Sequence, residues 1–388
     1  MSHAHSTNAS ANQAPPAGYE EAFREVTQAS HVPGRFYHDP AILAREEEVI
    51  FKREWLCLAR EEEFANPGDY KTYRIASQPV LLCRDEAGKM RAYANMCLHR
   101  GVEIASGSGN TQEFTCPYHG WLYNLDGQLL GASYMRDAEN FEAKKCRLPE
   151  LALGVWCGWV FVSLARQPMP FETYMKDFDE KFGFLQMQDL RMGLRMDVEL
   201  DCNWKLMVEN FIDFYHIGVL HKDTIGRFMR TTDVPYELRE RGQVYINEYD
   251  TGSLTKTGQS NGMRIPALED KGPRFSATGV LPPNINFFVR PDYVTMYTSW
   301  PLGPSRMRLT GVTLWRQETL AQPDADRIVA EFKTMVEKVV AEDVDMVESL
   351  QNVMKAEYFV PGRMSRLEKG VQHYIKHMVQ TVMGEAAA

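Results

Sequence analysis

Two cysteine–histidine pairs constrain the fold of this 388-residue chain more than any other feature. Cys97-Leu98-His99 and Cys116-Pro117-Tyr118-His119 are separated by residues 100–115. Two thiolates and two imidazoles are the ligands of a [2Fe–2S] cluster in which one iron takes both cysteines and the other takes both histidines. The sequence therefore predicts a small β domain that presents these side chains on two loops and that carries one electron at a time.

A structural zinc site is the alternative interpretation of the same residues. Zinc fingers usually place two cysteines close together and then two histidines, whereas each half here contributes one cysteine and one histidine. Strand patterns also flank both halves: residues 79–84 and 90–96 surround the turn 85–89, and residues 121–125 turn at Asp126-Gly127 into residues 128–130. The interleaved ligands and the loop setting favour iron–sulfur.

Length and charge limit the remaining function classes. An electron carrier needs only one domain, and 388 residues allow two or three domains of about 100–200 residues each. A net charge of −9 leaves no basic stripe for nucleic-acid phosphates. The longest apolar stretch, residues 151–165, is interrupted by Gly154, Gly158 and Ser163 and is shorter than the roughly 20 residues that span a bilayer. We expect no nucleic-acid partner and no membrane segment.

The N-terminus and the cysteines indicate where the protein is located. Residues 1–18 are rich in Ser, Ala, Asn, Gln and Pro and lack an apolar run, so they predict a disordered tail rather than a signal peptide. Five of the seven cysteines lie outside the two pairs. An odd remainder without framework spacing indicates free thiols in a reducing compartment, and we expect a cytoplasmic protein.

A second cluster of ligand-type residues follows the region of the cysteines. Residues 203–215 predict a helix whose apolar face is formed by Trp204, Val208, Phe211 and Tyr215. Asp213 and His216 share another face of this helix with Glu209. His221 follows His216 by a step of about 140° on a continuous helix, so the helix should end, widen or bend between the two histidines, with Gly218 placed to permit it. Two such histidines are either metal ligands or ordinary surface or core residues.

A carboxylate lies on the apolar stripe of a helix predicted within residues 326–355. The stripe is formed by Val336, Val340, Val347 and Leu350. Asp343 is only about 20° off the register of Val336, whereas Asp345 points to the opposite side. A carboxylate on a core-facing stripe is costly unless it is paired or bound to metal, so a buried salt bridge and a metal ligand both remain open for Asp343.

These motifs together resemble those of one family. C-x-H-R-G, C-P-Y-H-G-W and the segment from Glu209 to His221 look like the motifs of Rieske non-haem iron oxygenases, which include ring-hydroxylating oxygenase α subunits and related monooxygenases and demethylases. The resemblance extends from about Phe36 to Gln351. Respiratory Rieske proteins carry two further cysteines where this chain has Val102 and Tyr118. The resemblance therefore implies a cluster like the lower-potential members of the class.

The resemblance also implies a role for each candidate residue. The [2Fe–2S] cluster would be held by Cys97, Cys116, His99 and His119. The mononuclear Fe(II) would be held by His216, His221 and Asp343, with Asp343 favoured over Asp345. Asp213 would bridge a cluster histidine of one subunit to an iron histidine of its neighbour, which implies a ring of subunits, most simply a homotrimer.

The implied fold is α+β, with an N-terminal all-β Rieske domain ahead of a catalytic domain in which an antiparallel sheet wraps around a helix, the helix-grip or START-like arrangement. The expected domains are residues 1–18 as tail, 19–45 as a segment packing on the catalytic domain, 46–166 as the Rieske domain and 171–388 as the catalytic domain. Pro168-Met169-Pro170 marks the boundary.

The function implied is that of a terminal oxygenase that uses O2 to hydroxylate a small, largely apolar substrate by monooxygenation leading to N- or O-dealkylation. The alternatives are a dioxygenase that forms cis-diols in the catabolism of aromatic compounds, and a Rieske electron-transfer protein without oxygenase activity. No complete glycine fingerprint for a nicotinamide is present, so NAD(P)H acts only through a separate ferredoxin or reductase. The expected substrate-pocket residues are Asn210, Phe211, Ile217, Leu220 and Phe288.

Overall fold

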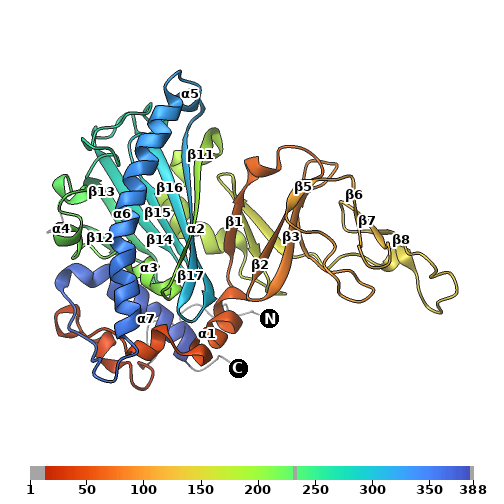
Figure 1. The fold of residues 1–388 in the computed structure, drawn as a ribbon, viewed down its shortest axis with the longest axis horizontal. Helices are drawn as coiled ribbons and strands as arrows, with labels where there is room; N and C mark the ends of the chain where they lie inside the picture. The colour runs from red at the N-terminus through yellow and green to blue at the C-terminus, as the bar shows by residue number, and fades with distance from the viewer. Residues whose placement is uncertain (1–13, 230–233, 385–388) are drawn as a thin grey trace, which may run out of the picture. The chain divides into compact units, whose positions relative to one another are not determined.

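The computed structural model describes residues 14–229 and 234–384 (Figure 1). The predicted disordered tail lies outside these residues as far as residue 13. The chain divides into two compact units: one comprises residues 47–176, and the other joins the segment ending at Glu46 to the segment that begins at Asp177. None of the described helices has the length and apolar character needed to cross a membrane.

The unit of residues 47–176 consists of small antiparallel sheets in its described part. Their strand orders are β4-β3-β2-β5, β6-β7-β8 and β1-β10-β9. The strands are β1 (Leu56–Arg60), β2 (Asp69–Ile75), β3 (Gln78–Arg84), β4 (Met90–Ala94), β5 (Ser108–Asn110), β6 (Glu113–Thr115), β7 (Leu122–Asn124), β8 (Leu129–Gly131), β9 (Ala152–Trp156) and β10 (Trp159–Ser163). The two hairpins predicted around turns 85–89 and 126–127 are confirmed as β3–β4 and β7–β8.

The turn between β3 and β4 shows why the sequence folds this way. The carboxylate of Asp85 accepts a hydrogen bond from the backbone N–H of Lys89 at 2.8 Å and pairs with Arg91 at 2.8 Å. Gly88 adopts a φ of 79°, a backbone angle that residues other than glycine rarely adopt. Because the turn is fixed, the inward side chains of the hairpin, Leu81, Cys83 and Tyr93, pack together in the core beside Cys97 and Cys116.

The other unit is built on one antiparallel sheet with the order β11-β17-β16-β15-β14-β13-β12. Its strands are β11 (Leu190–Leu200), β12 (Tyr236–Leu238), β13 (Val244–Asp250), β14 (Phe275–Leu281), β15 (Ile285–Val289), β16 (Tyr293–Gly303) and β17 (Arg306–Arg316). The strands predicted at residues 286–289, 294–300 and 307–315 are confirmed as β15, β16 and β17.

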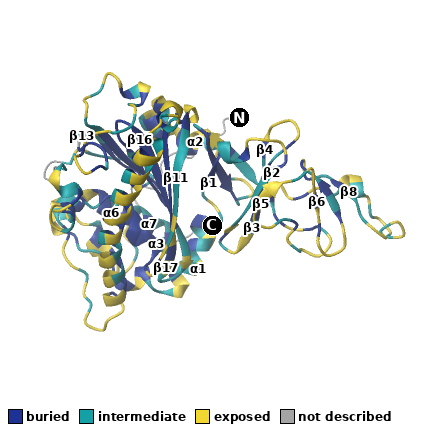
Figure 2. Cartoon of the chain, turned by 45° about the horizontal axis from the view of Figure 1, so that its top comes forward, coloured by how far each residue is buried: buried dark blue, intermediate teal, exposed yellow. Residues whose placement is uncertain are grey.

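The long helix α6 (Ala325–Val353) crosses one face of this sheet (Figure 1). Val336, Val340 and Val347 are buried on its inner side, and the outer side is exposed (Figure 2). Leu350, predicted on the same stripe, is 41% exposed, so the buried stripe does not extend to it. The α+β class and the helix-grip arrangement predicted from the resemblance are confirmed.

The remaining helices of this unit surround the same core. They are α1 (Pro40–Glu46), the C-terminal part of α2 (Phe171–Phe182), α3 (Trp204–Asn210), α4 (Ile217–Leu220), α5 (Gln317–Leu320) and α7 (Lys369–Met383). The segment before residue 46 is held by α7 and α3: the side-chain amide of Gln372 donates to the carbonyl of Ala22 at 2.9 Å, and Lys205 pairs with Glu46 where both side chains are fully buried.

The single helix predicted over residues 203–215 is wrong. Asn203 caps α3 by accepting a hydrogen bond from the N–H of Lys205 at 3.1 Å, and the helix ends at Asn210. After it, the carboxylate of Asp213 accepts a hydrogen bond from the N–H of Tyr215 at 2.7 Å, and Tyr215 is 60% exposed rather than on an apolar face. This local side-chain bond competes with the helical one, so the chain turns before it reaches His216.

Candidate metal centres

The two cysteine–histidine loops of the first unit repeat one backbone arrangement. In the first, the N–H of Cys97 donates to the carbonyl of Val102 at 2.7 Å, and the N–H of Gly101 donates back to Cys97 at 2.8 Å. In the second, the N–H of Cys116 donates to the carbonyl of Trp121 at 2.8 Å and that of Gly120 to Cys116 at 3.1 Å. Each loop is therefore closed at its base, with the cysteine at its root.

A glycine in each loop makes this closure sterically accessible. Gly101 and Gly120 have φ values of 80° and 68°, in the left-handed region that disfavours other residues. The C-x-H-R-G and C-P-Y-H-G-W motifs thus contain their glycines because the backbone must reverse there, not because a side chain would collide with a neighbour.

The ligand side chains of the loops divide into a buried and an exposed pair. Cys97 and Cys116 are 1% and 2% exposed, whereas both histidines are exposed with their Nδ1 atoms 3.0 Å apart. Burial raises the pKa of Cys97, although the hydroxyl of Tyr123, 3.4 Å from its Sγ, opposes that shift. Buried thiolates need a cation beside them, and paired imidazoles supply a second binding position, so these four residues fit a [2Fe–2S] cluster.

The second centre lies in the other unit and is organised by the single helical turn of α4. His216 stands at its N-cap and His221 at its C-cap, with the N–H of Leu220 donating to the carbonyl of His216 at 2.9 Å. Gly226 packs directly on this turn: a Cβ there would approach the carbonyl oxygen of His221 to 2.8 Å. The predicted end of the helix between the two histidines is confirmed, because α4 ends at Leu220 and His221 is no longer helical; Gly218 lies inside the turn and not at its end.

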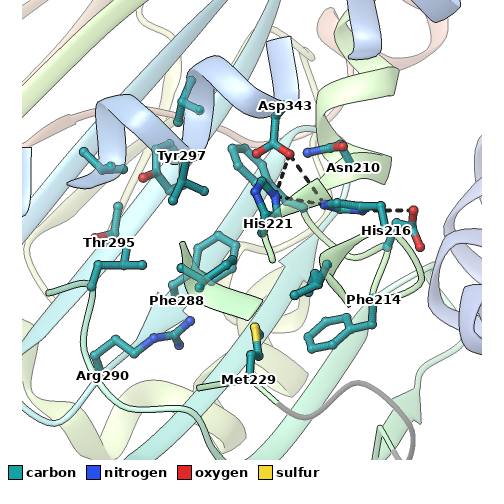
Figure 3. Close-up of a pocket in the computed structure, with 18 of the residues that line it drawn as sticks. Asn210, Phe214, His216, His221, Met229, Phe288, Arg290, Thr295, Tyr297 and Asp343 are labelled. Carbon is teal, nitrogen blue, oxygen red and sulfur yellow. Dashed lines mark hydrogen bonds and ion pairs between the residues drawn. The ribbon is translucent and has the colours of Figure 1, made fainter. Parts of the chain in front are cut away.

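Asp343 on α6 completes the centre. Its Oδ1 lies 2.9 Å from Nε2 of His221 and 3.5 Å from Nε2 of His216, and the two Nε2 atoms are 3.2 Å apart (Figure 3). Within the described residues, this is the one group of three or more His, Cys, Asp or Glu side chains whose ligand atoms all lie within 4.8 Å of one another. Asp345 is exposed on the outer side of α6.

The three atoms have the geometry of a metal site. Ligands bound at about 2.1 Å and at right angles are about 3.0 Å apart, close to the three distances here. Oδ1 of Asp343 is buried and has no hydrogen-bond partner among the described residues. An unsatisfied buried carboxylate oxygen beside two imidazole nitrogens is accounted for by a shared cation, so the residues fit a ferrous ion held on one face.

Two further carboxylates orient the histidines. Nδ1 of His216 lies 3.0 Å from Oδ2 of Asp213, and Nδ1 of His221 lies 2.7 Å from Oε2 of Glu342. Thr224 donates to the same Glu342 oxygen at 2.8 Å. Glu342 was missed by the sequence reasoning, and only its position next to Asp343 offered a signal. Carboxylates that accept from the outer ring nitrogen fix the orientation of a metal-binding imidazole and increase its basicity.

The electrostatics agree with a cation site. Burial lowers the pKa of His216, but the hydrogen bond to Asp213 and the charge of Asp343 raise it to about 9. The pKa of His221 is also raised, against the effect of burial, by Asp343 and Glu342. Burial raises the pKa of Asp343, yet the two imidazoles hold it below its usual value. The site therefore stabilises positive charge between the three side chains.

The three side chains lie at one end of an apolar pocket of about 680 Å³, its open mouth included (Figure 3). Four of the expected pocket residues line it, namely Asn210, Phe211, Ile217 and Phe288. Leu220 does not line it; its side chain is half-buried at the end of α4. The pocket also contains Tyr297, and residues that the sequence did not indicate, among them Met229, Arg290 and Thr295.

Comparison with known proteins gives two family matches. Residues 185–384, slightly more than half of the chain, match the model described as the ring hydroxylating alpha subunit (catalytic domain). Residues 54–142 match the Rieske [2Fe–2S] domain. The two matches cover the two units separately, with the four cysteine and histidine residues in one and the three-residue centre in the other.

Among similar proteins, the carnitine monooxygenase oxygenase subunit of Acinetobacter pittii is 26% identical over 89% of this chain and 93% of its own length. The glycine betaine monooxygenase oxygenase subunit of Chromohalobacter salexigens is 26% identical over 93% of this chain and 88% of its own. The crystal structure of a quaternary ammonium Rieske monooxygenase in complex with L-carnitine matches with a TM-score of 0.76 at 23% identity, covering 91% and 96% of the two chains. That structural likeness shows the fold.

Proposed function

Because the chain belongs to the ring-hydroxylating oxygenase alpha-subunit family, we propose that it is a terminal oxygenase that hydroxylates an N-methyl group of a quaternary ammonium compound and thereby removes it. It carries a Rieske [2Fe–2S] domain and a catalytic domain for mononuclear iron and O2. The observation that carries the proposal is the group of His216, His221 and Asp343 at the end of an apolar pocket.

The iron ligands are proposed to be His216, His221 and Asp343. A ferrous ion held by these residues would supply the activation of O2, with electrons from the cluster. The residues of the chain fix the position of the substrate and exclude water around it. Apolar side chains, including Ile217 and Val340, line the pocket together with the three ligands.

The aromatic lining favours a cationic methyl-bearing group. Phe211 stacks on Tyr297 with ring centroids 4.8 Å apart, and Phe288 meets both rings edge-on at 5.7 and 5.8 Å. Aromatic faces attract quaternary ammonium groups by cation–π interaction, without the hydrogen bonds that such groups cannot make. The two relatives above act on carnitine and on glycine betaine, which both carry a trimethylammonium group.

A trimethylammonium compound, O2, two electrons and two protons give the hydroxymethyl ammonium and one water. The hydroxymethyl group then leaves as formaldehyde, its C–N bond breaking with the electron pair kept by nitrogen, and one proton is released. A separate reductase or ferredoxin supplies the electrons. The alternative of arene cis-dihydroxylation has no support from these relatives.

Asp213 is proposed to be the electron-transfer bridge between subunits. Its Oδ2 contacts His216, Oδ1 accepts from Tyr215, and its side chain is 23% exposed. A partly exposed carboxylate can accept a second imidazole N–H from a neighbouring subunit. A head-to-tail contact of this kind closes most simply as a homotrimer.

The test combines metal analysis with product analysis. Anaerobically reconstituted protein should contain about three irons per chain, two in the cluster and one at the mononuclear centre. With a reductase, NADH and a panel of trimethylammonium compounds, it should release formaldehyde, with one ¹⁸O atom of ¹⁸O2 entering the product before exchange with water. A content of two irons, or a cis-diol formed from an arene, would contradict the proposal.

A further inference from the structure

Arg290 is a buried cation in the substrate pocket that the proposed chemistry does not use. It follows β15 directly, and it is only 6% exposed. Figure 3 shows its guanidinium directed inward toward Phe288 and Met229, on the wall away from Asp343 and the two histidines. A charged residue just after a strand usually reaches solvent, so its burial in the pocket calls for an explanation.

The contacts of Arg290 satisfy only a small part of its hydrogen-bonding capacity. Nη1 donates to the backbone carbonyl of Val289 at 2.9 Å, and the guanidinium carbon lies 5.6 Å from the ring of Tyr249 and 5.7 Å from that of Phe288. Among the residues that the structure describes, no carboxylate lies within ion-pair distance of Arg290. A guanidinium has five N–H donors, so several remain for a ligand.

The other charged side chains that line the pocket already interact with groups other than Arg290. Asp343 faces the two histidines, and Asp213 accepts from His216 and from the backbone of Tyr215. The pocket phenols near Arg290 are Tyr293 and Tyr297, and burial raises the pKa of both although Arg290 opposes the shift. They are neutral at physiological pH and supply no negative charge. The pocket therefore has one cation without a described counter-ion.

A buried, unpaired guanidinium is costly, and an anionic ligand would remove that cost. Its planar fork matches the two oxygens of a carboxylate, with which it forms paired, charge-assisted hydrogen bonds. The cation–π contacts with Tyr249 and Phe288 attract the guanidinium without using any of its N–H donors. The arrangement is that of a binding site for the anionic end of a substrate.

We propose that Arg290 binds the carboxylate of the substrate, and hence that the substrate is a zwitterion with a carboxylate at one end and a methylated ammonium at the other. This inference rests on the proposed oxygenase function. With the carboxylate on Arg290, the other end of the molecule extends past Phe288 toward the end of the pocket that holds His216, His221 and Asp343. One residue thus selects the substrate class and directs an N-methyl group toward the metal ligands.

Binding without turnover tests the proposal directly. Iron-loaded protein is titrated anaerobically by calorimetry with γ-butyrobetaine and with its primary amide, which has nearly the same shape without the negative charge. Wild-type protein should bind the acid about 10- to 100-fold more tightly than the amide, as expected for charge-assisted hydrogen bonds in a buried site. Equal affinities for acid and amide would overturn the proposal without the use of any variant.

Variants then test whether Arg290 causes the preference for the acid over the amide. Arg290→Gln should reduce the ratio of acid to amide affinity to about 3 or less, and Arg290→Lys, which keeps the charge but not the planar fork, should give an intermediate ratio. Arg306→Gln, which removes a surface arginine that is 60% exposed, should leave the ratio as in wild type. An Arg290→Gln protein that still prefers the acid would place the selectivity elsewhere.

A formaldehyde assay separates this inference from the proposed function. Selective binding of the acid by wild-type protein that then releases no formaldehyde with O2 and a reductase would contradict the oxygenase proposal and leave the role of Arg290 standing. Formaldehyde release from the acid and the amide with equal kcat/KM would support the oxygenase proposal and contradict the role of Arg290. Circular dichroism of each Arg290 variant verifies that it is folded.

Discussion

Replacing Glu209 by glutamine should change how the stability of the protein depends on pH. Glu209 lies on α3, is 7% exposed, and accepts hydrogen bonds to both oxygens from the hydroxyl of Tyr37 at 3.1 and 3.0 Å. Burial raises its pKa from 4.5 to about 7, although His31, Tyr37 and Lys205 act in the opposite direction. The two contacts with the Tyr37 hydroxyl offset only part of the cost of burying the ionised carboxylate. The folded protein therefore favours the neutral acid.

Proton linkage determines whether the free energy of unfolding rises or falls with pH. Between pH 4.5 and 7 the folded protein holds a proton on Glu209 that the unfolded chain has released, so the free energy of unfolding falls as the pH rises through this window. With pKa values of 4.5 and about 7, the destabilisation by ionised Glu209 is about 1 kcal/mol at pH 5 and about 3 kcal/mol at pH 8. Glutamine resembles the neutral acid and carries no such penalty.

The assay is urea denaturation of wild type and Glu209→Gln from pH 5 to 8, followed by circular dichroism. The stability of the variant relative to wild type should increase by roughly 2–3 kcal/mol across this range, because only wild type has to ionise a buried carboxyl group at position 209. Glu357→Gln, at an exposed position, provides the control for loss of one negative charge. A stability difference that stays constant from pH 5 to 8 would show that Glu209 is ionised throughout, and the reasoning would be refuted.

Three further substitutions test the metal centre and its support. Glu342→Gln should weaken Fe(II) binding about 10- to 100-fold, because His221 loses its carboxylate acceptor; unchanged affinity in an anaerobic iron titration would contradict this. Asp213→Ala should retain the Rieske spectrum and most of the iron but lose turnover, and an active variant would remove the bridge. Lys205→Met should destabilise the protein by about 3–5 kcal/mol in urea denaturation, because it leaves the buried carboxylate of Glu46 without its cation. A second change, Glu46→Leu, should recover most of this loss. A double variant that is no more stable than the single one would argue against the ion pair.

The sequence predicted those parts of the molecule in which the spacing of apolar residues matches the side that is buried in the fold. Strands β15 to β17 alternate or run apolar between turn residues, and Asp343 interrupts a regular apolar stripe, so both were visible before the fold was known. The helix over residues 203–215 was mispredicted because its apolar spacing continues beyond Asn210. The backbone N–H groups of Ile212 and Asp213 bond three residues back, and that of Tyr215 bonds to the side chain of Asp213; periodicity contains no signal for either change.

Other site residues could not be found from the sequence, because their roles depend on contacts between distant segments. Glu342 is next to Asp343 on α6, and only the packing of α6 on α4 brings it to His221 and Thr224. Arg290 occupies a strand end, where charged residues are ordinarily solvated. Its orientation into the pocket becomes evident only when β15 and β16 are paired and its neighbours Phe288 and Tyr249 are in place.

The one-turn helix between His216 and His221 has a consequence for metal supply. Its backbone hydrogen bonds, together with the close packing of Gly226, set the spacing of the two imidazoles through the polypeptide rather than through the ion. A triangle of donors fixed in this way suits many divalent first-row ions, and copper and zinc generally bind such donors more tightly than ferrous iron does. Protein produced in zinc-rich medium should therefore be mismetallated, with an intact cluster in one unit and a redox-inert ion in the other.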